Sequence, residues 1–186
     1  MAMTSQKKEG SNWSCPGPAL RFAYLSTSLG TMLATATAKG LCALRFCHES
    51  QRSEDLAELK KQFPRTELKE DPDTLRFLLA QVEKVLEGRL PAARVPLDLA
   101  GTPFQKRVWQ KLLEVPWGQT LSYSDLARQV GKPRAVRAVA SACARNPIVF
   151  IIPCHRILRK GGGLGGYYWG LQMKQELLDR EKKSPR

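Results

Sequence analysis

The stretch PRAVRAVASACARNPIVFIIPCHR, residues 133–156, decides how this chain is interpreted. Its first part is rich in alanine and begins with proline, which predicts a helix from Pro133 to Arg145 that ends before the next proline. The apolar run IVFII, residues 148–152, predicts a buried strand with Cys154 at its tip. A helix, a turn and a short strand would therefore place a cysteine, a histidine and an arginine together.

The predicted helix carries a basic face. Residues at spacings of three and four share one side of a helix, and here they are Arg134, Arg137, Ser141 and Arg145. Ala135 and Ala138 keep that side thin, so that guanidinium groups can reach phosphates. A solvated stripe is the usual alternative, but no Asp or Glu occurs between Asp125 and Glu176. We therefore predict contact with DNA, mainly through its backbone, because no Asn or Gln lies on that face to read adenine.

The residues upstream of this helix predict a helix-turn-helix. Thr102 and Gln105 flank a proline in a capping-box pattern, which predicts a helix start. Ser122 can cap a short helix over residues 123–130, and Gly131 separates it from the alanine-rich helix.

The N-terminal half has a different pattern. Residues 21–46 contain three short strands separated by Ser-Leu-Gly and Lys-Gly turns, which predict an antiparallel meander. Asp71 and Pro72 start a helix that Gly88 closes. The predicted fold class is α/β of the α+β kind: a small N-terminal domain with an antiparallel sheet and helices, and a mainly helical, winged-helix-like C-terminal domain with a short active-site strand. We place a flexible lead at 1–19, the domains at 20–97 and 98–182, and a tail at 183–186.

Charge separates the same two halves. The 186 residues carry a net charge of +13, with hydrophobic residues at 42% and charged residues at 25%, which is typical of a globular protein. Residues 1–99 hold 14 basic and 12 acidic residues, whereas residues 100–186 hold 16 basic and 5 acidic ones. Such an excess predicts an anionic partner. No apolar run approaches the ~20 residues of a membrane-spanning helix, and the N-terminus lacks a signal-peptide core, so we expect a cytoplasmic protein without a membrane partner.

Five cysteines at irregular spacing favour thiols rather than disulfides. Cys42, Cys47 and His48, with Cys15 as a fourth ligand, would make a metal site. Their spacing matches no standard zinc module, and Cys42 lies in an expected buried strand, so we predict no bound metal.

Cys154 is the candidate nucleophile. A cysteine reacts as its thiolate, and His155 and Arg156 beside it predict a thiol pKa below the ~8.5 of a free cysteine. Neighbours on a strand point to opposite sides, so the cysteine and histidine cooperate only if the chain leaves β geometry here or a water bridges them. A buried structural cysteine beside a surface histidine is the alternative. Pro153 and the glycine run at 161–166 favour a shaped pocket instead.

The tetrapeptide PCHR at 153–156, reached from Asn146-Pro147 and followed by Gly165-Gly166-Tyr167, resembles the active-site motif of the O6-alkylguanine-DNA alkyltransferases, or methylated-DNA–protein-cysteine methyltransferases. GTPFQKRVWQ, SYSDLARQVGKPRAVRAVASACARNP and GYYWGLQMKQELLDRE are similar to further family segments and occur in the family's order. The resemblance covers about residues 100–182. It implies a ribonuclease-H-like sheet in the N-terminal domain, to which residues 20–97 correspond only loosely.

The resemblance also implies roles for individual residues. Cys154 would accept the alkyl group from O6 of guanine, and O4-alkylthymine would be a second substrate. His155 would take the thiol proton through a water, with Glu181 orienting it. Asn146 would tie the turn together, and Tyr123 would donate to guanine N3.

The same resemblance implies an interface with double-stranded DNA that contains O6-alkylguanine, contacted through the minor groove and phosphates. Arg137 would fill the gap left by the flipped base. The remaining DNA contacts would be Arg134, Ala135, Ala138, Ser141, Arg145, Lys132, Ser124 and Lys160, and the substrate pocket would include Tyr167, Gly165, Tyr168 and Cys143. The expected enzyme is a monomer that needs no cofactor, works once and irreversibly, and is nucleoid-associated in a bacterium or nuclear in a eukaryote.

Two other functions remain open at this point. A non-catalytic helix-turn-helix protein that senses DNA damage or regulates transcription would share the basic helix and differ only in an inert Cys154. A thiol hydrolase would use the cysteine but would give the arginine-rich helix no purpose.

Overall fold

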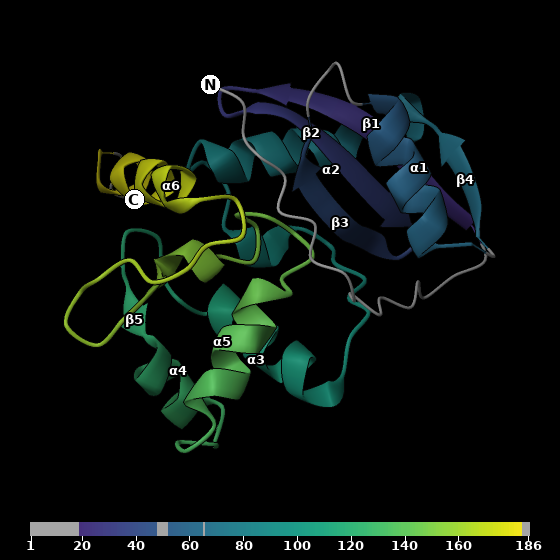
Figure 1. The fold of residues 1–186 in the computed structure, drawn as a ribbon. Helices are drawn as coiled ribbons and strands as arrows, with labels where there is room; N and C mark the ends of the chain where they lie inside the picture. Colours follow the sequence, from purple (N-terminus) through teal and green to yellow (C-terminus); the bar gives the residue numbers. More distant parts are fainter. Residues whose placement is uncertain (1–18, 48–51, 65, 184–186) are drawn as a thin grey trace.

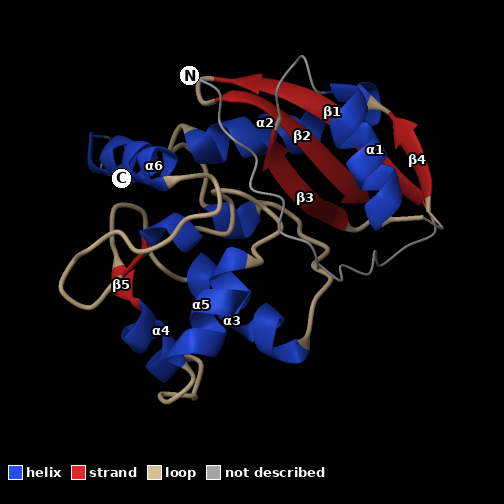
Figure 2. Ribbon diagram, in the orientation of Figure 1, coloured by secondary structure: helices blue, strands red, loops and turns tan. Residues whose placement is uncertain are grey.

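The computed structural model describes residues 19–47, 52–64 and 66–183. The strands and helices of the first half are β1 (Ala19–Thr27), β2 (Gly30–Thr37), β3 (Gly40–Phe46), α1 (Arg52–Gln62), β4 (Glu67–Glu70) and α2 (Pro72–Leu86). After the 3-10 turn η2 (Ala92–Arg94) follow α3 (Pro103–Leu113), β5 (Leu121–Ser122), α4 (Tyr123–Gln129), α5 (Val136–Ala144), η3 (Cys154–Arg156), β6 (Ile157–Leu158) and α6 (Leu171–Lys183). Figure 1 and Figure 2 show the sheet gathered at one end of the molecule and α3, α4 and α5 at the other.

The four-stranded sheet has the order β3-β2-β1-β4. Strands β1, β2 and β3 form the predicted antiparallel meander, and Thr27 faces Gly30 across the first turn. Strand β4 was not predicted, because ELKE at 67–70 is short, charged and mostly exposed. It pairs in parallel with the start of β1, so only this long-range partner makes it a strand.

The two faces of the sheet are covered by different helices, as Figure 1 shows. Leu20 and Phe22 belong to a cluster that includes Leu59 and Phe63 at the end of α1. Ala23 and the other buried residues of the opposite face join α2 and the C-terminal half in one larger core. The alternation along β1 thus separates a small outer cluster from the core that reaches the site.

Local helix-start signals in the second half are confirmed. Thr102 Oγ1 accepts from Gln105 N at 3.2 Å, while Gln105 Oε1 accepts from Thr102 N at 2.8 Å, which completes the capping box of α3. Ser122 caps α4 in the same way. The Trp109 Nε1–H on α3 donates to the carbonyl of Ala142 on α5 at 2.9 Å, which ties the three-helix unit together.

The predicted start of the alanine-rich helix was wrong. Helix α5 begins at Val136, and Ala135, with φ −91° and ψ 31°, lies outside it. The Ala135 N–H donates to the carbonyl of Lys132 at 2.8 Å, so these residues close a turn that competes with the helix. Arg134 therefore lies in the turn, and Arg145 follows the last helical residue.

The predicted strand at 148–152 was also wrong. Beyond one bridge at Ile148 the segment turns twice: Ile151 N donates to the carbonyl of Val149 at 2.6 Å, and Ile152 N to that of Ile148 at 3.1 Å. Phe150 has φ +49°, a left-handed conformation that a strand does not contain. All five side chains are buried. A fully buried turning segment and a central strand both require a continuous apolar sequence, so the sequence does not distinguish them.

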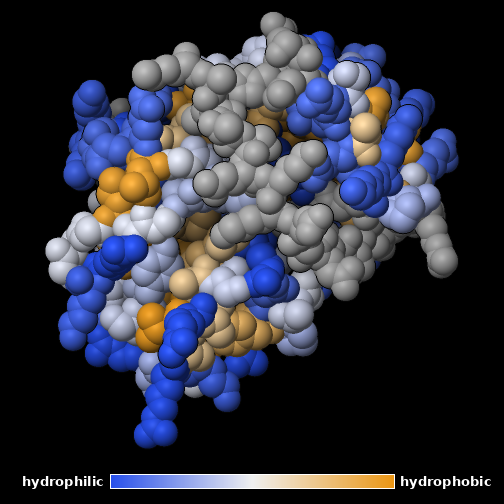
Figure 3. Space-filling view, viewed as in Figure 1, coloured by the Kyte–Doolittle hydropathy of each residue, from blue (hydrophilic) through white to orange (hydrophobic). Residues whose placement is uncertain are grey.

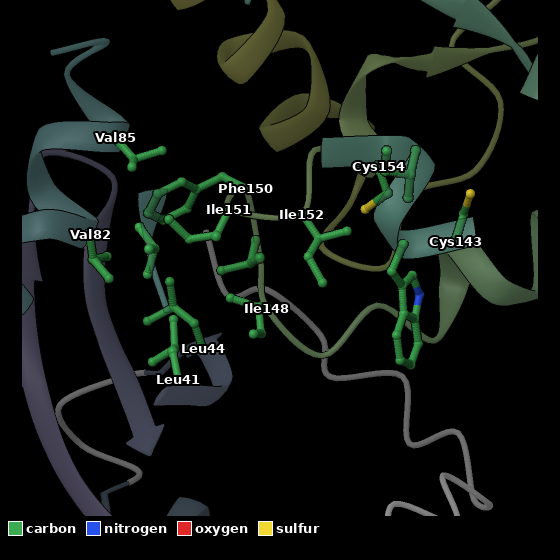
Figure 4. Close-up of a cluster of buried hydrophobic side chains, with 14 of the residues drawn as sticks. Leu41, Leu44, Val82, Val85, Cys143, Ile148, Phe150, Ile151, Ile152 and Cys154 are labelled. Atoms are coloured by element: carbon green, nitrogen blue, oxygen red, sulfur yellow. The ribbon is translucent and has the colours of Figure 1, made fainter. Parts of the chain in front are cut away.

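This turning segment joins the halves. Leu44 N on β3 donates to the carbonyl of Pro147 at 3.0 Å, and Val149 N donates to the carbonyl of Leu44 at 3.0 Å, so the segment covers the edge of the sheet. Figure 4 shows Ile148, Phe150 and Ile151 between the side chains of α2 and β3 on one side and Cys154 on the other. The core of the sheet is therefore continuous with the residues that hold the cysteine.

The surface is mixed in character. On the face that Figure 3 presents, apolar side chains form small groups among hydrophilic ones. The longest and most apolar helices within residues 19–47, 52–64 and 66–183 still fall short of what crossing a membrane requires.

Candidate active site

Cys154, His155 and Arg156 form the single 3-10 turn η3 rather than part of a strand. The chain therefore leaves β geometry here, as Cys154 and His155 require in order to act together. The three side chains are buried, with exposed fractions of 8%, 1% and 5%. A thiol, an imidazole and a guanidinium thus lie together out of solvent.

Asn146 organises the turn before the cysteine. Its Nδ2–H donates to the carbonyl of Ile152 at 2.7 Å and to Cys154 Sγ at 3.1 Å. Its Oδ1 accepts from Ile148 N at 3.0 Å. One side chain therefore satisfies backbone groups of the turning segment and touches the candidate nucleophile directly.

A buried network connects His155 to α6. His155 Nε2 lies 2.7 Å from Glu181 Oε1, and Glu181 Oε2 accepts from Gly118 N at 2.9 Å. Arg156 donates to both carboxylate oxygens of Glu181 at 2.9 to 3.1 Å and to the carbonyl of Val115 at 2.5 Å. The carboxylate is held in one orientation from three directions.

The electrostatics of this network set the protonation states. Burial by itself raises the pKa of Glu181, but the hydrogen bonds from His155 and Arg156 outweigh it and lower the pKa to about 2. Burial lowers the pKa of His155, and Glu181 only partly opposes this. The resting site therefore holds a neutral imidazole that donates from Nε2 to an ionised carboxylate, with Nδ1 left as the acceptor nitrogen.

The prediction of a lowered thiol pKa was wrong. Burial raises the pKa of Cys154, and the hydrogen bond from Asn146 and the charge of Lys174 offset the burial only in part. Arg156, which was expected to act on the thiol, is directed at Glu181 instead. The resting cysteine is a neutral thiol, so it has to lose its proton during the reaction.

Other predicted pocket residues surround this turn. Tyr123 at the start of α4 is half-buried, and burial raises its pKa to about 12. The Tyr167 hydroxyl is buried without a hydrogen-bond partner among the described residues. Gly165 has φ +67°, and a Cβ there would lie 3.3 Å from the Tyr123 ring. Cys143 is buried on α5.

The loop that carries Tyr167 also contacts the sheet. Tyr168 is 60% exposed, and its ring centroid lies 5.0 Å from that of Trp169. The Trp169 ring in turn lies 5.3 Å from Phe46 at the end of β3, nearly perpendicular to it. Tyr168 therefore lies at the rim of this region rather than inside it.

The predicted DNA-contacting residues lie together around α5. The exposed ones are Lys132, Arg134, Arg137, Ala138, Arg145 and Lys160, and the half-buried ones are Ser124, Ala135 and Ser141. Arg145 donates to the Ser141 hydroxyl one turn earlier on the helix. Between α4 and the loop after β6 lies an open cleft of about 400 Å³ that Ser124, Arg128 and Lys160 help to line.

Sequence reasoning assigned Arg156 to the thiol and gave Lys174 no role. In the structure Arg156 orients Glu181 instead. Lys174 on α6 is completely buried, although charged residues of an amphipathic helix normally face solvent. The one sequence signal for its burial is the spacing of seven residues from Glu181, which puts both side chains on one face of the helix.

No group of metal-ligating side chains comes together in the part of the chain that the structure describes. Cys42 Sγ donates to the carbonyl of Thr35 at 3.2 Å within the sheet. Cys15 and His48, the other two residues of the considered metal set, lie outside the described residues.

A buried cysteine, histidine and carboxylate next to a basic helix-turn-helix define a DNA-binding protein with a reactive thiol. Family models agree: residues 20–99 match the ribonuclease-like domain of 6-O-methylguanine DNA methyltransferase, and residues 103–183 match its DNA binding domain. The chain belongs to the 6-O-methylguanine DNA methyltransferase family.

Individual relatives support this assignment. The chain is 40% identical over 168 residues to the inducible methylated-DNA–protein-cysteine methyltransferase of Bacillus subtilis, covering 90% of this chain and 93% of that protein. It is 41% identical to the bifunctional transcriptional activator/DNA repair enzyme Ada of Escherichia coli, of which it spans 46%. The crystal structure of Mycobacterium tuberculosis OGT in complex with DNA superposes with a TM-score of 0.72 at 34% identity, covering 89% of this chain and 93% of that one.

These comparisons confirm four predictions. They confirm the family resemblance, the α+β fold class, the enzyme class of methylated-DNA–protein-cysteine methyltransferase, and DNA as the partner. They do not favour the non-catalytic regulator. The roles of single residues stay predictions.

Proposed function

We propose that this chain repairs DNA by direct reversal, moving the alkyl group from O6 of guanine to its own Cys154. The observation that carries the proposal is the buried arrangement of Cys154, His155 and Glu181 beside the helix-turn-helix. A regulatory protein with an inert cysteine has no need to bury an imidazole and a carboxylate behind its thiol.

The thiol proton leaves through His155. Because Nε2 donates to the ionised Glu181, Nδ1 is the basic nitrogen, and it is buried without a partner among the described residues. A water between Cys154 and this nitrogen would pass the proton on, and Glu181 would stabilise the imidazolium that forms. The thiolate forms as this proton leaves.

The alkyl transfer is a single displacement at carbon. The sulfur of Cys154 forms a bond to the alkyl carbon, the bond from that carbon to O6 breaks, and the electron pair stays on the guanine. Tyr123, whose pKa of about 12 keeps its hydroxyl protonated, donates to guanine N3 and so improves the leaving group. Overall, the proton lost by the thiol replaces the alkyl group on guanine, and no cofactor takes part.

The base reaches the thiol only after it leaves the duplex. We assign Arg137 to the gap in the stack, because it is exposed on α5 beside Ala138 where the backbone can come close. Lys132, Arg134, Ser141 and the other predicted contacts would hold the phosphates. Tyr167, Gly165 and Cys143 would surround the flipped base, with Tyr168 at the rim. The chain would act as a monomer in the compartment that holds the DNA, and O4-alkylthymine would be a second substrate.

The reaction should occur once per molecule. Its product is a thioether, which has no carbonyl for water to attack and which cellular thiols cannot exchange as they do a disulfide. The experiment is to mix limiting protein with excess O6-methylguanine duplex and to measure protein mass and repaired guanine. One added methylene on the Cys154 peptide and a plateau of one guanine per protein support the proposal.

Cys154→Ala supplies the control, because it should bind the duplex but gain no mass. Retained transfer in this variant would exclude Cys154 as the acceptor. A plateau far above one guanine per molecule would indicate a true catalyst. Binding without any transfer by the wild type would leave the damage-sensing regulator as the better function.

Arg137→Ala tests the base-flipping role. Only duplex DNA needs a flipped base to be supported, so transfer from duplex should fall by about tenfold or more, while transfer from the free base O6-benzylguanine stays unchanged. Arg107→Ala, an exposed change on α3, is the control for lost charge alone. Equal losses with both substrates would contradict the role of Arg137.

A further inference from the structure

Trp117 lies where the two halves of the molecule meet, and the transfer described above gives it no role. It is half-buried in the turn between α3 and β5. The end of α2 lies next to α6 here, as Figure 1 shows, and Val85 of α2, Leu177 of α6 and Trp117 line the same small gap. The indole is therefore placed between the N-terminal half and the helix that carries Glu181.

Glu181 lies in the last turn of its helix, because α6 ends at Lys183. The last four carbonyls of a helix have no N–H partner within it, and helix ends fray unless other groups bind these carbonyls. The Trp117 Nε1–H donates to the carbonyl of Glu181 at 3.1 Å. The indole thus supplies the partner that the helix itself lacks, at the residue that orients His155.

The same turn also contacts the side chains of the buried network. The N–H of Gly118, the next residue, donates to Glu181 Oε2 at 2.9 Å, so two successive residues hold the main chain and the carboxylate of Glu181. Arg156 Cζ lies 5.6 Å from the centroid of the Trp117 ring, within the range of a cation–π contact. A movement of the indole would therefore shift the carboxylate and the guanidinium that binds it.

The N-terminal half supports the ring from the other side. Gly88 follows the end of α2 and has φ +73°. A Cβ at this position would lie 3.2 Å from Cζ2 of Trp117, which is closer than an ordinary contact. The backbone after α2 thus approaches the indole as only glycine allows, and it limits where the ring can lie.

Other ionisable groups face Glu181 or His155. They come from η3, the loop before α6 and α6 itself, and they are Arg156, Tyr167, Lys174 and Arg180. The residues that α2 places at this gap, Val85 and Leu86, are apolar. Trp117 contacts Arg156 and Glu181, so a change at the indole reaches His155 through these two side chains.

We propose that Trp117 is a positioning residue for alkyl transfer: its indole N–H holds the end of α6 so that Glu181 faces His155, and the backbone of Gly88 supports the ring. This inference rests on the proposed function of Cys154. It gives the N-terminal half a part in the reaction, because α2 places Gly88 against the indole.

The test follows the reactivity of Cys154 against pH. Wild type and Trp117→Phe, which keeps a ring but loses the N–H, are treated with iodoacetamide, and labelling of the Cys154 peptide is measured by mass spectrometry. With Glu181 less well placed, His155 is a weaker base, so labelling at neutral pH should fall by about fivefold. The loss should shrink as pH rises, because hydroxide then removes the thiol proton without the relay.

Transfer from the O6-methylguanine duplex in a single turnover should show the same dependence on pH, while the affinity for the duplex stays unchanged. Trp109→Phe is the matched control, because it also removes an indole N–H that donates to a backbone carbonyl, that of Ala142 at 2.9 Å. This control should lower thermal stability and leave the pH profile unchanged, since Ala142 does not belong to the relay.

Gly88→Ala tests the support from α2. Its methyl group would push the indole, so labelling at neutral pH should fall by about twofold. Gly30→Ala is the control for backbone strain, because Gly30 has φ +111° and a Cβ there would meet nothing within 4 Å. If Trp117→Phe does not fold, the comparison of these two variants decides.

A folded Trp117→Phe with the pH profile of the wild type would overturn the proposal. A loss of the same size at every pH would also overturn it, because a purely structural role has that effect. If Gly88→Ala behaves like Gly30→Ala, the support from α2 is wrong. Failure of the proposed function looks different: the wild type would be labelled by iodoacetamide but would take no methyl group from DNA.

Discussion

The half of this molecule that contains the four-stranded sheet and the half that contains Cys154 bury different kinds of side chain. Among the described residues, the buried polar or charged side chains are Thr35 in the sheet and His155, Arg156, Lys174 and Glu181 in the second half. The sheet and its helices pack by apolar contacts, which are tolerant and non-directional. The site depends on charges whose partners must all be present. Stability and reactivity should therefore respond differently to substitutions in the two halves.

Glu181→Gln is the strongest test of this difference, because it removes a charge and keeps the shape. Arg156 would remain buried without its carboxylate, which should destabilise the fold by about 3–5 kcal/mol. His155 would lose the anion that stabilises its protonated form, so transfer should slow by about 100-fold or more. Urea unfolding and single-turnover transfer measure the two effects.

Glu176→Gln is the matched control on the same helix. Glu176 is exposed, and its pair with the half-buried Arg180, 3.8 Å apart, should contribute less than about 1 kcal/mol. Similar losses of stability and transfer rate in both variants would mean that the buried network contributes no more than an exposed ion pair.

Leu20→Ala is the corresponding test in the sheet. Leu20 is fully buried in the cluster beneath α1, so its truncation should cost about 2–5 kcal/mol. The transfer rate of the molecules that remain folded should not change, because this cluster lies on the face of the sheet away from the site. Ser26→Ala, an exposed change on β1, serves as the control. A slower transfer in folded Leu20→Ala would break the proposed separation between the halves.

Acid should weaken the site half first. The pKa of His155 is lowered in the fold. As pH falls below ~6.5, the unfolded chain therefore binds a proton at this histidine that the folded chain does not bind, and the free energy of unfolding decreases. Glu181, with a native pKa of about 2, stabilises the fold above its unfolded value of ~4.3, and this contribution, about 3 kcal/mol, is lost as pH falls toward 2. Urea unfolding at a series of pH values should show both stages.

The same series with Glu181→Gln should lack the lower stage. An unchanged slope below pH ~4 in that variant would show that other carboxylates cause acid unfolding.

Thr102→Ala should have the smallest effect. Loss of the hydroxyl that accepts from Gln105 N should destabilise α3 by about 1 kcal/mol without slowing transfer. Thr102→Ser keeps the acceptor and should stay close to the wild type. Thermal unfolding of the three proteins measures this difference. Equal stability of all three would show that the capping box does not stabilise α3.

Much of this protein is determined by the sequence itself, because the relevant interactions are local. The capping boxes at Thr102 and Ser122 and the turn at Gly30 depend on residues three or four positions apart. The order of PCHR, the basic helix and the final helix with Glu181 was sufficient for the resemblance to the family that the comparisons then confirmed.

Tertiary structure decided the rest. Residues 148–152 turn because Asn146 and Leu44 supply their hydrogen-bond partners, and an apolar run alone does not reveal them. Strand β4 exists because β1 pairs with it. The raised pKa of Cys154 and the buried charge of Lys174 follow from what other segments place around them. Periodicity and capping are encoded over a few residues, whereas burial and electrostatic environment are properties of the assembled fold.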